Sequence, residues 1–88
     1  MRTATDVAHW MLLELERRGG WLPEAEAVSF IAQTFGGEFV SEHARGPSSV
    51  NRVVVDALLQ LSGGTVRWNE GERAWLFSDA GEAGERLV

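Results

Sequence analysis

Apolar residues recur at helical spacing in the segment before the first Gly-Gly pair of the chain. Thr3 or Thr5 can cap a helix whose first turn contains Asp6, because a threonine hydroxyl accepts a hydrogen bond from a backbone N–H that the first turn leaves free. Gly19-Gly20 ends this helix, since glycine readily takes the left-handed conformation that follows many helices. The stripe that we expect to face the core contains Val7, Trp10, Met11 and Leu15, widened by Leu12 and Leu13.

A second helix is predicted between Pro23 and the next glycine pair, Gly36-Gly37. Proline biases the residue before it towards an extended conformation, so Trp21-Leu22 is expected to form a short extended link, and Pro23 suits a first helical turn. The apolar positions at helical spacing that follow are Val28, Ile31, Ala32 and Phe35. Phe30 falls outside this stripe, which leaves it packed on the hairpin or at an interface.

The third predicted helix has the most regular pattern, and it follows a polar loop. Residues Glu38 to Pro47 contain Phe39-Val40 and are otherwise polar, so we expect a loop with at most a one-pair strand. Ser48 or Ser49 is expected to cap the helix. Its apolar positions, at i, i+3, i+4, i+7, i+8 and i+11, are Val50, Val53, Val54, Ala57, Leu58 and Leu61, and Gly63-Gly64 ends it.

Two β-prone runs near the C-terminus predict a hairpin. Thr65–Trp68 and Arg73–Phe77 flank a polar turn in which Gly71 can supply the positive φ of a tight turn. A two-residue loop would place Val66 and Trp68 on the same face as Trp75 and Phe77, whereas a bulged loop would change the pairing, so the register stays open.

These elements predict one α+β domain over residues 1–78, with three helices, a short strand after the first helix and a C-terminal hairpin; residues 79–88, rich in glycine and acidic residues, are expected to form a flexible tail. Three features from Thr5 to Phe77 resemble the winged-helix branch of the helix-turn-helix superfamily. They are the Trp21-Leu22 link, the Val50–Leu61 helix and the wing sequence Thr-Val-Arg-Trp-Asn-Glu-Gly-Glu-Arg-Ala-Trp-Leu-Phe. The chain is also similar to small uncharacterised bacterial domains that begin with Asp-Val-Ala-x-Trp-Met and end in a Trp-flanked hairpin. The resemblance implies a binding function, because such folds host both DNA readers and protein-interaction modules.

The composition indicates a soluble, cytoplasmic protein. The 88 residues are 44% apolar, which fits one small domain whose four Trp and four Phe supply much of the core. The absence of cysteine excludes disulfides and thiolate metal sites and is consistent with a reducing compartment. The N-terminus lacks the pattern of a signal peptide, and the longest apolar run, Trp10–Leu13, is too short to cross a bilayer, so we expect no membrane partner.

Charge weighs against nucleic acid as the main partner. The net charge is −5 and every basic residue is Arg, so the field of the whole molecule repels polyanions. The resemblance implies that the third helix would enter the major groove and the wing would touch the DNA backbone. Glu70 and Glu72, however, occupy the tip of the wing. DNA binding is therefore the alternative, and it requires four side chains to gather as a basic patch, namely Arg45, Arg52, Arg67 and Arg73.

A second apolar strip on the third helix favours a protein partner. Val55 and Leu59 lie four residues apart on the side opposite the predicted core stripe, where either the hairpin covers them or they are exposed. An exposed strip beside a tryptophan would resemble the centre of a protein interface. We therefore predict a non-enzymatic module that acts through protein–protein contact, with a homodimer as the simplest form. The predicted interface consists of Val55, Leu59, Trp68 and Trp75.

No residue pattern predicts a catalytic centre, a cofactor or a small-molecule substrate. Asp6 with His9, and Glu42 with His43, provide only two histidines, fewer than the three or four ligands of a zinc site. A nucleophile and base could be imagined in the loop that His43 shares with three serines, Ser41, Ser48 and Ser49. No strand–nucleophile–helix turn surrounds them, so a hydrolase would need a defined pocket around His43.

Overall fold

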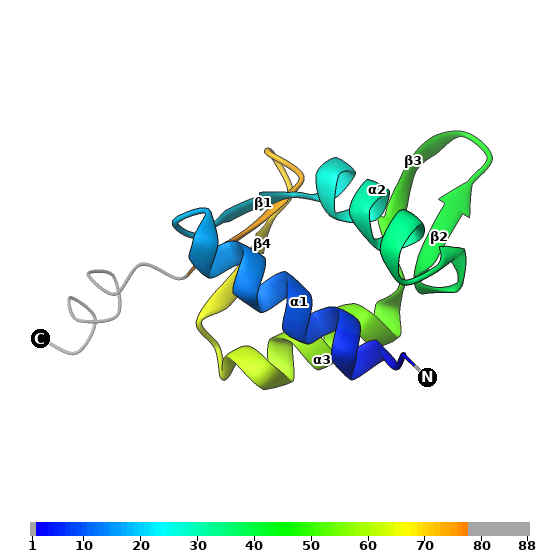
Figure 1. The fold of residues 1–88 in the computed structure, drawn as a ribbon. Helices are drawn as coiled ribbons and strands as arrows, with labels where there is room; N and C mark the ends of the chain where they lie inside the picture. The colour runs from blue at the N-terminus through cyan, green and yellow to red at the C-terminus, as the bar shows by residue number, and fades with distance from the viewer. Residues whose placement is uncertain (1, 78–88) are drawn as a thin grey trace, which may run out of the picture.

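The computed structural model describes residues 2–77, which form three helices, a 3-10 turn and two small antiparallel sheets, as expected for an α+β fold (Figure 1). The elements in chain order are α1 (Ala4–Arg17), β1 (Trp21–Pro23), α2 (Glu24–Thr34), η1 (Gly37–Phe39), β2 (Val40–His43), β3 (Gly46–Val50), α3 (Arg52–Ser62), β4 (Val66–Asn69) and β5 (Ala74–Phe77). The tail expected over residues 79–88 lies outside the described residues.

The first helix begins at a capping box. The Thr3 hydroxyl accepts a hydrogen bond from the Asp6 N–H, and the Asp6 carboxylate accepts one from the Thr3 N–H. Of the two predicted caps, Thr3 is therefore correct, because the reciprocal pair satisfies two backbone donors that the first turn leaves free. After the helix, Gly19 has a φ of +79° and Gly20 a φ of +97°, which turns the chain directly into β1.

The short strand β1 joins the C-terminal hairpin in a three-stranded sheet of order β1-β5-β4. Val66 pairs with Phe77 and Trp68 with Trp75, so these four side chains share one face, as predicted for the two-residue loop. The loop itself is longer, because Asn69 pairs with Ala74 across four intervening residues. The expected role of Gly71 is wrong: the positive φ belongs to Arg73, at 49°.

The expected loop before α3 is instead a β-hairpin, formed by β2 and β3 with an irregularity between Ser41 and His43. Ser48 and Ser49 lie in β3 and do not cap α3. The cap is Asn51, whose side-chain oxygen accepts a hydrogen bond from the Val53 N–H at 3.4 Å. The hairpin packs against α2, and this tertiary support allows a largely polar segment to form strands that its own pattern does not favour.

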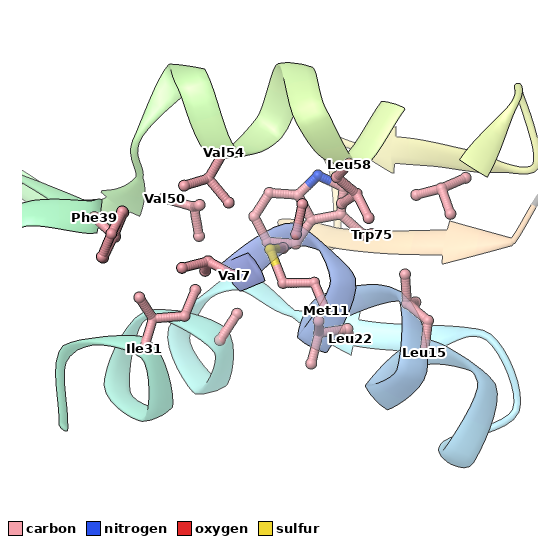
Figure 2. Close-up of a cluster of buried hydrophobic side chains, with 13 residues drawn as sticks. Val7, Met11, Leu15, Leu22, Ile31, Phe39, Val50, Val54, Leu58 and Trp75 are labelled. Atoms are coloured by element: carbon pink, nitrogen blue, oxygen red, sulfur yellow. The ribbon is translucent and has the colours of Figure 1, made fainter. Parts of the chain in front are cut away.

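The core lies where all three helices meet the three-stranded sheet (Figure 2). Its largest fully buried side chains are Met11, Leu15, Leu22, Ile31, Leu58, Val7 and Val54. Four predicted core residues fall elsewhere, since Leu13, Ala32, Val53 and Leu61 are exposed. The reason in α3 is that Val50 belongs to β3, so the buried face of the helix follows Val54 and Leu58 at i and i+4 rather than the longer predicted stripe.

Candidate interaction surface

The four arginines of the predicted basic patch come from separate parts of the molecule. Arg45 follows β2 in the turn of the β2–β3 hairpin, and Figure 1 shows this turn well apart from the β4–β5 turn, with α2 between them. Arg67 is exposed on β4, and Arg52 begins α3. The four arginines therefore belong to four different segments, and the turn with Arg45 lies apart from the turn that precedes Arg73.

Two of these arginines are already paired with carboxylates. The Arg73 guanidinium donates to the Glu24 carboxylate at 2.5 Å and also lies 3.5 Å from Glu70. Arg52 donates to Asp56 at 3.2 Å, one turn further along α3. Because each pair places a carboxylate beside the guanidinium, it reduces the positive potential that α3 and the β4–β5 hairpin offer to phosphate.

The predicted interface is only partly exposed. Trp75 is 2% exposed and belongs to the core, so it is removed from any interface; its ring lies 4.8 Å from that of Trp68, which is half-buried. Val55 is also half-buried against the core, and only Leu59, at 43% exposure, presents a large part of its side chain to solvent. The cross-strand pair Trp68–Trp75 therefore helps to hold the β4–β5 hairpin against the core.

An aromatic surface lies on α1 and α2, where the sequence pattern predicted mostly core residues. The rings of Trp10 and Phe30 stack in parallel with centroids 4.2 Å apart, and Phe35 is tilted against both at 6.3 and 6.4 Å. Leu13 lines the same shallow surface hollow as Trp10 and Phe35. Leu13 is 53% exposed and Phe30 41%. We call Trp10, Leu13, Phe30 and Phe35 the α1–α2 patch.

One signal for this patch was present in the sequence, because Phe30 falls outside the apolar stripe of its helix. The other residues were assigned to the core: the stripe predicted for α1 included Trp10 and Leu13, which the structure leaves half-buried and exposed. Helix α1 contains more apolar residues than one face can bury, and periodicity alone does not identify the surplus.

Charged side chains surround the α1–α2 patch. Arg2 lies over the Phe35 ring at 4.8 Å, and Asp6 and His9 line the same hollow. At the far end of α1, Arg17 and Arg18 both donate hydrogen bonds to Glu14. These two donors lower the pKa of Glu14 to about 2, so its carboxylate stays ionised over the physiological range.

The residues considered for catalysis do not line a pocket with a complete set of catalytic groups. His43 Nε2 lies 2.9 Å from Ser49 Oγ, but both belong to the exposed β2–β3 hairpin, and no third group within the described residues orients the imidazole. A nucleophile and base need that third group and a pocket for substrate. A hollow nearby, between α2, β3 and the β4–β5 turn, contains the Glu24 carboxylate already paired with Arg73.

The histidines and carboxylates considered as metal ligands do not gather in larger groups within the described residues. Across residues 2–77, no three side chains of His, Asp or Glu gather in a way that could hold a metal ion. No helix in the same range has both the length and the hydropathy to cross a membrane.

The comparison with protein families gives one match. The chain belongs to a family of unknown function, DUF6953, whose model matches residues 3–77. The match spans all three helices and both sheets. No curated protein and no solved structure matches the chain.

Proposed function

We propose that this member of the DUF6953 family is a non-enzymatic winged-helix module that acts through protein–protein contact, with self-association as its simplest form. The order of elements supports the winged-helix assignment. Three helices form the body, β1 connects α1 to α2, and β1 pairs with β5 of the C-terminal hairpin. In this reading β4 and β5 are the wing, and β2–β3 is a hairpin inserted between α2 and α3.

The exposed α1–α2 patch is the observation that supports protein contact. Scattered apolar side chains are normal on a protein surface, but contiguous apolar patches mark interaction sites. Here a stacked Trp10–Phe30 pair lies beside an exposed leucine, and aromatic side chains of this kind dominate the energetic centres of interfaces. Our proposal therefore places the interface on α1 and α2, in place of the α3 and hairpin residues predicted from the sequence.

DNA binding is the weaker alternative because of the pairing described above. A DNA reader of ordinary affinity makes several phosphate contacts, roughly 6 to 10 in strongly salt-dependent cases. Arg52 and Arg73 are engaged by carboxylates, and acidic side chains occupy the wing turn. If duplex DNA were the partner, fluorescence anisotropy at low salt would detect binding that weakens with added salt and on Arg67→Ala.

Sedimentation velocity on the full chain, from low micromolar to millimolar concentration, tests the proposal. We expect the wild type to shift towards a dimer as concentration rises, and Leu13→Asp to stay monomeric because a carboxylate would be buried in the contact. Leu59→Asp is the matched control, since it places the same charge on an exposed leucine of α3. A wild type that remains a monomer throughout would contradict self-association, and loss of association only in Leu59→Asp would move the interface back to α3.

A further inference from the structure

One stripe of α1 combines the apolar side chains of the patch with opposite charges at its two ends. Asp6, Trp10, Leu13 and Arg17 occur at i, i+4, i+7 and i+11, and at about 100° per residue they fall within one narrow arc of the helix. This arc lies on the side of α1 away from the buried Val7, Met11 and Leu15. The stripe runs from a negative end, through an apolar centre, to a positive end.

The stripe is symmetric about a point between residues 11 and 12. Asp6 and Arg17 are equally far from this point, and so are Trp10 and Leu13. A surface with this arrangement is complementary to itself under a two-fold rotation, which is the requirement of an isologous dimer contact.

We infer that the occupant of the α1–α2 patch is a second copy of this chain, whose α1 lies antiparallel to the first across a two-fold axis between residues 11 and 12. The inference rests on the proposed function and adds the geometry of the contact. Trp10 of each copy then packs against Leu13 of the other, with Phe30 of α2 beside it. Asp6 of each copy faces Arg17 of the other at both ends of the contact.

Charge selects this arrangement over a parallel one. In a parallel contact Asp6 would face Asp6 of the second copy, and Arg17 would face Arg17. Like charges would then lie together at both ends. Asp6 and Arg17 both lie on the surface, but Arg17 is paired with Glu14 and would exchange that partner for Asp6 of the second copy. The Arg17 side chain is 68% exposed, and Asp6 uses only one carboxylate oxygen in the capping box. Glu14 keeps Arg18 as a partner if Arg17 turns towards the second copy.

Charge reversal and mixing test the geometry. Asp6→Arg and Arg17→Asp each replace two attractive contacts per dimer by two repulsive ones, and we expect each variant alone to dimerise about tenfold more weakly than the wild type in sedimentation velocity. An equimolar mixture of the two variants should recover the wild-type affinity, because in the mixed dimer every Arg faces an Asp. Arg17→Asp leaves the capping box intact, and recovery in the mixture shows that both variants are folded.

Asp56→Arg and Arg52→Asp are the controls. They change the net charge by the same amounts at an exposed pair on α3, and we expect each to dimerise like the wild type. If both α1 variants dimerise like the wild type, or if mixing does not restore affinity, the antiparallel geometry is wrong while self-association through another face stands. If the wild type itself stays monomeric, the proposed function fails together with the inference.

Discussion

Gly20 fixes the backbone at the point where α1 meets the three-stranded sheet. Its φ of +97° is a conformation that other residues rarely adopt, and its carbonyl accepts a hydrogen bond from the Phe77 N–H at 3.1 Å. A Cβ atom at Gly20 would lie 2.9 Å from Cδ2 of Phe77, closer than packed atoms approach. Glycine is therefore required here for two reasons, the positive φ and the close ring.

Gly20→Ala should lower the free energy of unfolding by about 1 to 3 kcal/mol, through backbone strain and displacement of the Phe77 ring. Urea unfolding followed by tryptophan fluorescence measures the change. Gly37→Ala is the matched control, because its φ is not positive and nothing lies within 4 Å of an added Cβ. Equal effects of the two substitutions would show that Gly20 has no special role.

Glu14 makes stability depend on pH. In the folded chain, hydrogen bonds from Arg17 and Arg18 lower its pKa from 4.5 to about 2. A carboxylate whose pKa is lower in the folded state adds stability above its unfolded pKa and loses it as pH falls through the folded value. The wild type should therefore lose part of its stability between about pH 4.5 and pH 2, and Glu14→Gln should lose less over the same interval. Urea unfolding at pH 7 and pH 3 checks this; an identical loss in both proteins would contradict it.

At the scale of elements, α1, α2 and the β4–β5 hairpin could be predicted from periodicity and glycine pairs, because each has a strong local pattern. The β2–β3 hairpin could not be, since its segment is mostly polar and its strands are supported by contacts with α2. The start of α3 was misplaced for a related reason: Val50 fits a helical stripe in sequence, but in the fold it completes β3 by pairing with Val40. Pairing between β2 and β3 therefore determines where α3 begins, which the spacing of apolar residues does not.

The capping box gives a prediction for a single element. Thr3→Ala should reduce the free energy of unfolding by about 1 kcal/mol, because the Asp6 N–H at the start of α1 loses its acceptor. Thr5→Ala should be neutral or slightly stabilising, since Thr5 lies within the helix, where alanine is the better helix former. Thermal unfolding by circular dichroism distinguishes the two. A larger loss of stability in Thr5→Ala than in Thr3→Ala would show that Thr3 is not the residue that caps α1.

For the whole molecule, the sequence pattern predicted the interface on the third helix and the C-terminal hairpin, and the structure covers part of that surface. Val55 and Trp75 were expected at an interface and are covered by the fold, whereas Leu13 was expected in the core and is exposed. Each helix has more apolar positions than one face can bury, so the exposed ones are decided by how three helices and the wing pack together. That information lies in pairwise contacts between elements, which periodicity within one element does not contain.

Self-association at the α1–α2 patch should make thermal stability depend on protein concentration. A partner that binds only the folded chain raises the free energy of unfolding, by about 1.4 kcal/mol when its free concentration is ten times the dissociation constant. For a domain of this size that corresponds to a rise in the wild-type midpoint of about 8 °C. Scanning calorimetry at concentrations from well below to well above the dissociation constant measures it, and Leu13→Asp should show one midpoint throughout. A constant wild-type midpoint, or an equal rise in the variant, would mean that this patch does not bind a second copy.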